Sequence, residues 1–145
     1  MLQCNTVDFS KAIIADAATV QAGKLYIHGG GWDRIFTTAL PWVHPSLAIA
    51  FVLRVEYLEA LTDHPVVIEL VDDDEQPVFP RIEGTVRVGH PPMIAPGSPI
   101  FVPQAITLNS LQFARHGTFR FRITAGGASA EVPFYVSPPM PPARG

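Results

Sequence analysis

Residues 15–33 read ADAATVQAGKLYIHGGGWD, and this stretch decides the fold. Two segments of strand composition flank a turn at Gly23-Lys24, and the second segment ends in three glycines at positions 29–31. A phosphate-binding glycine loop needs a helix behind it, whereas Trp32 is followed by strand-forming residues. We therefore interpret the glycines as a bulge or kink that bends one strand between two sheets.

The rest of the chain alternates with the period of β-strands. Between residues 47 and 58 every odd position is apolar, which is typical of a central strand in a sandwich. Residues 119–124 and 129–135 alternate in the same way around a hairpin loop at residues 125–128. Pairing Thr124 with Ser129 aligns three further pairs, which are Phe121 with Val132, Phe119 with Phe134, and Arg122 with Glu131 on the outer face.

Short strands are also predicted at about residues 11–20, 24–38, 65–72, 78–88 and 104–113. The chain has 15 prolines and 11 glycines, which exclude long helices and fit strands joined by turns. We predict an all-β fold, an immunoglobulin-like antiparallel β-sandwich of roughly seven to nine strands. One domain is expected over residues 1–137, followed by a proline-rich tail at residues 138–145.

Composition limits the partners and the location. Apolar residues make up 48% of the 145 residues and charged residues only 16%, against roughly 25% in an ordinary domain. This deficit predicts either self-association or a protein partner, with a flat-surfaced monomer as the alternative. A net charge of −3 with scattered basic residues argues against nucleic acid. The apolar run at 47–53 is too short to span a membrane, and no secretion signal is recognised, so we expect a cytoplasmic protein without membrane contact.

No set of side chains predicts catalysis, a cofactor or a metal. Residues 72–75 form an acidic cluster that we interpret as a turn rather than a calcium site. The five histidines, at positions 28, 44, 64, 90 and 116, lack the short spacing of zinc ligands, although loops could still bring them together. Cys4 is the only cysteine, so an intrachain disulfide is excluded, and no nucleophile motif surrounds it. We predict a protein that is not an enzyme.

Four segments together resemble a known family. They are ADAATVQAGKLYIHGGGWDRI, LPWVHPSLAI, VVIELVDDDEQPVF and HGTFRFRITAGGASAEVPFYV, within about residues 12–136. The combination looks like a widespread group of small bacterial single-domain proteins of unknown function. The resemblance implies a β-sandwich and no established enzymatic activity.

The leading hypothesis is a non-enzymatic protein-interaction module that self-associates or binds a protein partner through a sheet face or loops. One alternative is a structural subunit of a larger cellular or viral assembly, and a second is a small-molecule or metal-dependent enzyme that uses loop histidines. Apolar residues within the proline-rich loop at 90–103 must lie against the sandwich itself or against a partner. For Trp32 both a core position and an exposed contact position remain open. The candidate contact residues are Trp32, Trp42, Met93, Ile94, Phe101 and Tyr135.

Overall fold

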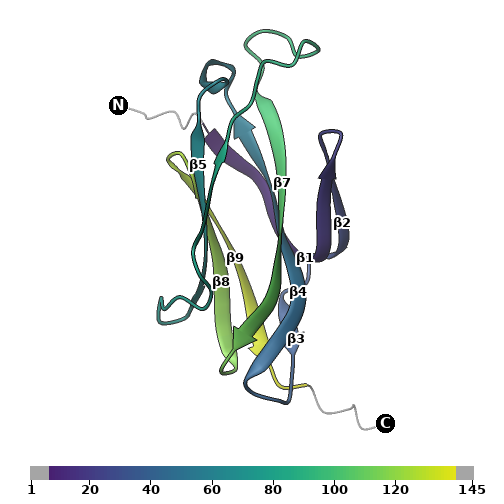
Figure 1. The fold of residues 1–145 in the computed structure, drawn as a ribbon, viewed down its shortest axis with the longest axis vertical. Helices are drawn as coiled ribbons and strands as arrows, with labels where there is room; N and C mark the ends of the chain where they lie inside the picture. The colour runs from purple at the N-terminus through teal and green to yellow at the C-terminus, as the bar shows by residue number, and fades with distance from the viewer. Residues whose placement is uncertain (1–6, 140–145) are drawn as a thin grey trace.

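The computed structural model describes residues 7–139 as a sandwich of two β-sheets (Figure 1). One sheet has the strand order β2-β1-β4-β7 and the other has the order β3-β9-β8-β5-β6. The predicted all-β sandwich is confirmed, with one pair, β3 with β9, running parallel. The strands are β1 (Val7–Gln21), β2 (Lys24–Gly30), β3 (Arg34–Phe36), β4 (Trp42–Val55), β5 (His64–Asp72), β6 (Ile82–Val86), β7 (Ile100–Phe113), β8 (Gly117–Ala125) and β9 (Ala128–Ser137).

The core lies between the two sheets and is built from the alternating apolar positions. β4 lies between β1 and β7, as predicted for a central strand, and its odd positions from Leu47 to Val55 are fully buried. Across the core, four phenylalanine rings pack at centroid distances of 5.0–5.9 Å, and they belong to Phe113, Phe119, Phe121 and Phe134. Burial of these rings together with the aliphatic core residues supplies most of the driving force for folding.

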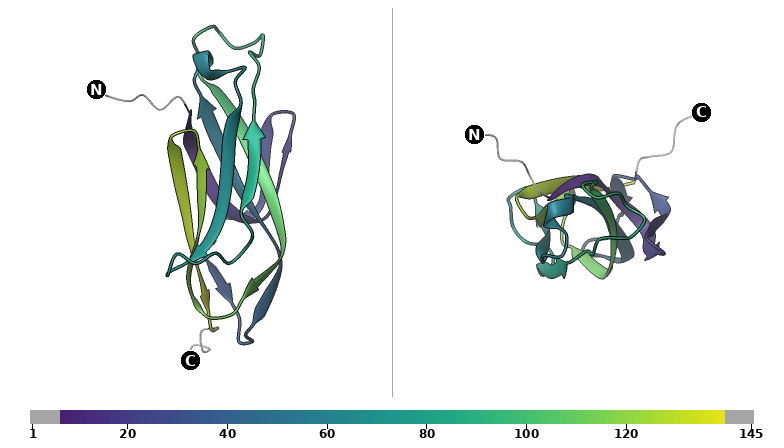
Figure 2. Two further views of the ribbon diagram at one scale, coloured as in Figure 1. Left: turned by 60° about the vertical axis from the view of Figure 1, so that its left-hand side comes forward. Right: turned by 90° about the horizontal axis from the view of Figure 1, so that it is seen from above.

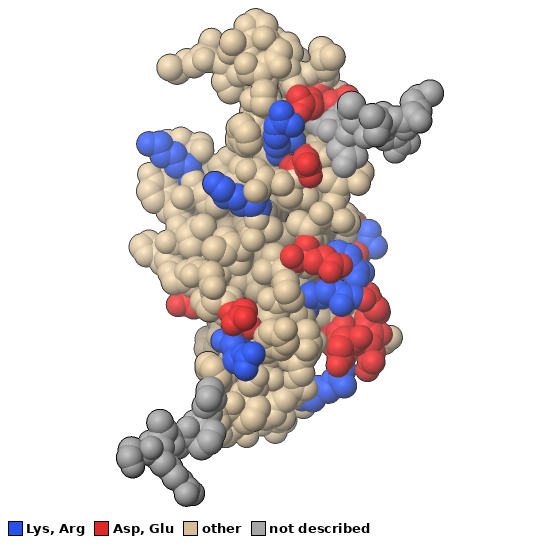
Figure 3. Space-filling model, turned by 180° about the vertical axis from the view of Figure 1, so that it is seen from behind, with Lys and Arg blue, Asp and Glu red and all other residues tan. Residues whose placement is uncertain are grey.

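The predicted register of the β8–β9 hairpin is confirmed at every pair. Phe119 lies opposite Phe134 and Phe121 opposite Val132, facing the core. On the outer face Arg122 Nε lies 3.3 Å from the carboxylate of Glu131. Glu75 and Arg120 join this charged network, so that opposite charges gather on one side of the molecule (Figure 3).

The β1–β2 hairpin does not simply extend its sheet. Its turn is Ala22-Gly23, both with positive φ, rather than the predicted Gly23-Lys24, because Gln21 already pairs with Lys24. The hairpin stands beside β7 (Figure 2) and forms a second small core on the outer face of its own sheet. Ala48 and Ala50 of β4 are fully buried there against Ala18. Their small side chains allow this close approach.

The three glycines carry the chain from one sheet to the other, as predicted. β2 ends at Gly30, Gly31 has a φ of +86°, and the chain continues into β3 of the opposite sheet. The predicted strand at 24–38 is therefore two strands in different sheets. Gly29 has a φ of +62°, and a Cβ there would lie 2.3 Å from Oδ2 of Asp16, so both the backbone conformation and the side chain of Asp16 favour glycine at this position.

Several predicted boundaries were wrong. The strand expected at 78–88 is only the five residues of β6, and β7 begins at Ile100 instead of residue 104. Ile100 to Pro103 therefore pair with β4 and do not belong to an irregular loop. Residues 57–59 form a single 3-10 turn, and no helix among residues 7–139 is long and apolar enough to cross a membrane. Cys4 and most of the predicted tail lie outside the described residues.

Candidate functional site

The predicted contact residues divide between two places far apart on the sandwich. Met93, Ile94 and Phe101 lie near one end, in the β6–β7 loop and at the start of β7. β3 and β4 begin toward the other end (Figure 1), and Trp32 and Trp42 line a cavity beside these strand starts. Tyr135 of β9 lies next to that cavity: Arg34 is one of the lining residues, and its guanidinium carbon lies 4.9 Å from the centroid of the Tyr135 ring. The candidates therefore form two regions of different character.

The first region is an exposed apolar end. We use this name for Leu58, Leu61, Met93 and Phe101, whose exposed fractions are 88%, 52%, 96% and 55%. The β6–β7 loop is held against the 3-10 turn, since the His90 ring stacks on Tyr57 with centroids 4.0 Å apart. The Leu61 amide also donates to the Val88 carbonyl at 2.7 Å. The loop is thus fixed in place, yet the Met93 side chain is almost fully exposed, whereas Ile94 is half-buried.

The apolar end continues into the free edge of β7. Within residues 7–139 this strand hydrogen-bonds only to β4, and residues 88–114 contain no Asp, Glu, Lys or Arg. On the face that Figure 3 shows, no charged side chain is visible on the outermost part of this end. Beside the edge, a cavity of about 220 Å³ opens between the sheets and reaches Phe51 and Ile68 of the core. Natural edge strands usually carry charges that prevent pairing with another chain, and this edge lacks them.

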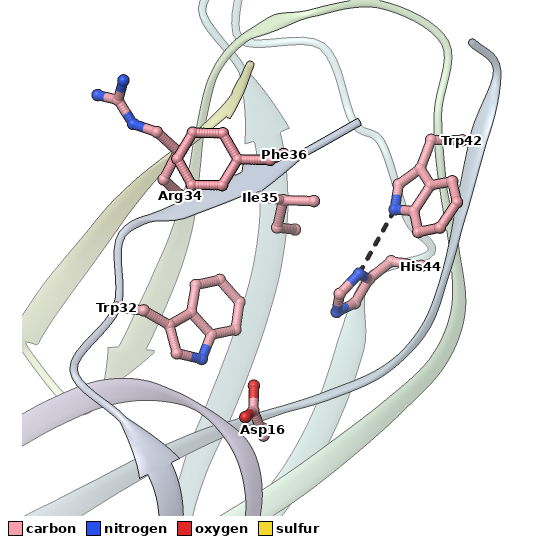
Figure 4. Close-up of a pocket in the computed structure, with 7 residues that line it drawn as sticks. All are labelled: Asp16, Trp32, Arg34, Ile35, Phe36, Trp42 and His44. Carbon is pink, nitrogen blue, oxygen red and sulfur yellow. Dashed lines mark hydrogen bonds between the residues drawn. The ribbon is translucent and has the colours of Figure 1, made fainter. Parts of the chain in front are cut away.

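The second region is a cavity of about 310 Å³ with an aromatic wall (Figure 4). The His44 ring lies between the two indoles, 6.4 Å by centroid from Trp32 and 6.4 Å from Trp42. Both indoles are half-buried and pack against the main core. Trp32 therefore combines the two positions that the sequence left open, since one part of its ring packs on the core and another part lines the cavity.

The polar groups of the cavity differ in whether they have a partner. Trp42 Nε1 donates to His44 Nδ1 at 3.4 Å, whereas Trp32 Nε1 is buried without a hydrogen-bond partner among residues 7–139. Burial lowers the pKa of His44, opposed in part by the charge of Asp16, so the imidazole is neutral near pH 7. Arg34 points away from the other lining residues (Figure 4). The Asp16 carboxylate forms no ion pair or hydrogen bond with any of residues 7–139.

The acidic cluster is a turn, as predicted. Asp72 Oδ1 accepts hydrogen bonds from the amides of Asp74 and Gln76, each at 2.9 Å. The Gln76 amide is the main cause of a lowered pKa at Asp72. Among the described residues these aspartates are the only three metal-ligating side chains that lie close together, and Arg115 contacts all three carboxylates.

The histidines do not converge. His64 is buried at the start of β5 and contacts the Glu59 carbonyl, while His116 contacts the Thr37 carbonyl. His90 and His44 lie in the two separate regions described above. His28 lies on β2, and among residues 7–139 no histidine belongs to a group of three or more metal-ligating side chains that lie close together.

Sequence reasoning missed Asp16 and His44 as cavity residues. Both lie in the segments that carried the family resemblance, Asp16 in the Ala-Asp opening and His44 in the LPWVHP segment. With Trp32 after the glycines, three separate motifs meet at one cavity. These motifs converge because β1, β3 and β4 lie close together in the fold. No local sequence pattern predicts that arrangement.

Comparison with known proteins identifies the family and no function. The chain belongs to a family of unknown function, DUF6941, whose model matches residues 10–137. No curated protein matches the chain.

Proposed function

We propose that this member of a family of unknown function is a non-enzymatic protein-interaction module that associates first of all with a second copy of itself. The observation that carries the proposal is the apolar end, where Met93 and Leu58 are almost fully exposed beside an uncharged strand edge. Exposed apolar groups that adjoin one another mark protein contact sites more often than isolated ones do. We also propose that this contact forms in the cytoplasm, the location expected from the sequence.

A second copy fits this surface for an electrostatic reason. In a two-fold symmetric contact each side chain lies near the same surface of its partner, so charges on the contact surface would meet like charges. Residues 88–114 carry none, and the nearby ion pairs of Arg54 with Glu56 and of Arg87 with Asp63 are each neutral as a unit. Glu59, between Leu58 and Leu61, is the one charged side chain of residues 54–63 that forms no ion pair with residues 7–139. Self-association would therefore bury apolar area with little electrostatic repulsion.

The edge of β7 adds to the contact only in part. Pro103 lacks an N–H group, and Ser110 has a φ of +57°, so both interrupt a continuous ladder. Residues 104–109 remain between them for pairing with another strand. We expect the apolar end to supply most of the affinity and the strand edge to fix the orientation.

Light scattering over a wide range of protein concentration tests this proposal. We expect a monomer–dimer equilibrium that the double variant Met93→Glu/Phe101→Glu weakens by about tenfold or more, because it places charges at the contact. Tyr26→Glu on β2 is the matched control, since Tyr26 is 47% exposed and lies outside the apolar end. A wild-type protein that stays monomeric throughout, or a double variant that dimerises as well as Tyr26→Glu, would contradict the proposal.

A structural subunit of a larger assembly is the second candidate function. It is favoured by one observation, the presence of two partly apolar regions toward opposite ends of the sandwich. Contacts between unlike ends produce open chains, whereas a self-complementary contact closes at a dimer. A mass that keeps rising with concentration would favour the assembly, and a plateau at two copies would favour the module.

A further inference from the structure

We infer that the aromatic cavity binds a compact quaternary ammonium group, carried either by a free small molecule or by a methylated side chain of a protein. This inference is independent of self-association, because the cavity and the apolar end share no residue. It rests on the chemistry that the cavity presents and on its size.

The wall of the cavity offers π-electron surface rather than hydrogen bonds. The Trp32 N–H is buried and the Trp42 N–H is bound to His44, so the accessible parts of both indoles are carbon. His44 continues this wall between them. Indole rings attract cations through the negative faces of their π systems, and aromatic cages bind quaternary ammonium groups in this way.

The charges of the cavity favour a cation. Asp16 contributes a carboxylate with no partner among residues 7–139, and Figure 4 shows it beside Trp32 and His44. The neutral imidazole adds no opposing charge. Arg34 is the one positive group in the lining, and its guanidinium stacks on Tyr135 and points away from Asp16 (Figure 4).

A quaternary ammonium fits better than a primary one. A primary ammonium has three N–H donors, and the carboxylate of Asp16 is the only charged acceptor in the lining. A quaternary group needs no acceptor and can contact the aromatic wall on several sides. The volume of about 310 Å³ is at the lower end of the range of roughly 300–1,000 Å³ for ligand pockets, so the ligand must be compact.

Intrinsic fluorescence gives a direct test, because the chain has only two tryptophans and both line the cavity. The probes are choline and 3,3-dimethyl-1-butanol, in which carbon replaces the charged nitrogen. We expect a saturable change with choline at a concentration about tenfold lower than with the neutral alcohol. Equal responses to the two probes would count against a free small molecule as the ligand, and they would overturn the inference if the peptide described below also showed no preference for its trimethylated form.

Two variants assign the effect to the cavity. Asp16→Asn should remove most of the preference for choline, while Asp33→Asn, a neighbouring exposed carboxylate outside the lining, should keep it. Circular dichroism confirms that both variants fold. An Asp16→Asn variant that folds and retains the full preference would contradict the role of the carboxylate.

A second pair of probes distinguishes the two sources. A short peptide with one trimethyllysine is compared with the same peptide carrying lysine. Tighter binding of the trimethylated peptide than of choline assigns the site to a protein-borne group, and the reverse order assigns it to a free molecule. No preference for trimethyllysine over lysine, together with no preference for choline over its neutral isostere, would overturn the inference.

Discussion

The apolar end and the aromatic cavity both hold large apolar side chains near the surface, yet they differ in how far these side chains pack on the core. Met93 at the apolar end is 96% exposed, so it contributes little to the folded monomer. Trp32 and Trp42 are half-buried and pack on the main core while they also line the cavity. A side chain that the fold does not need points to a partner, whereas one shared by core and cavity points to a preformed site. Stability and binding should therefore respond differently in the two regions.

Truncation of the aromatic wall should have the largest effect on stability. Trp32→Ala removes an indole that packs on the core, so we expect the free energy of unfolding to fall by about 2–3 kcal/mol. Met93→Ala should change it by less than about 0.5 kcal/mol. Urea unfolding measures both values. Equal losses for the two variants would remove the distinction between the regions.

Enlarging the alanine surface beneath the β1–β2 hairpin should have an intermediate effect. Ala50 is fully buried on the outer face of β4, so Ala50→Leu should destabilise the fold by about 1–3 kcal/mol. Displacement of the hairpin also moves Asp16, and choline binding should weaken while self-association is retained. Ala17→Leu on the exposed side of the hairpin is the control. If Ala50→Leu leaves both stability and choline binding unchanged, the hairpin does not position the cavity.

Acidification should have the smallest effect and should act on the cavity region. The folded state lowers the pKa of His44, mainly through burial and against the charge of Asp16. Above pH of about 6.5 the ring is neutral in both the folded and the unfolded state, so it contributes no pH dependence. Below that pH the unfolded chain binds the proton first, and the stability of the fold decreases. Urea midpoints at pH 7.5 and about pH 5.5 should therefore differ more in the wild type than in His44→Gln, and an identical dependence would exclude His44 as the cause.

The sequence predicted the parts of the fold in which the alternation of apolar and polar residues along a strand matches the alternation of buried and exposed side chains. In the β8–β9 hairpin the alternating Phe119 and Phe121 face the core and Arg122 faces Glu131, so the register follows from the pattern alone. The β1–β2 hairpin carries the same kind of signal, but its packing depends on Ala48 and Ala50 of another strand. The small size of these two alanines indicates a close approach of the hairpin only once the hairpin is known to pack on them.

The candidate site was predictable only in part, for the same reason. Met93 and Phe101 could be proposed as contact residues because apolar side chains in a proline-rich segment need a neighbour, and the structure shows both exposed, with Phe101 on a strand. The cavity joins Asp16, Trp32 and His44 from three segments, and the crossing from β2 to β3 brings them together. This crossing is a feature of the tertiary structure, and the spacing of residues along the sequence does not predict it.

Hydrogen–deuterium exchange at low and high protein concentration tests self-association through the apolar end most directly. If a second copy covers this surface, amides within residues 88–114 should exchange more slowly at high concentration, while those of β2 should not change. The protection should disappear in Met93→Glu/Phe101→Glu. Exchange in residues 88–114 that is independent of concentration, or protection confined to other strands, would contradict the account.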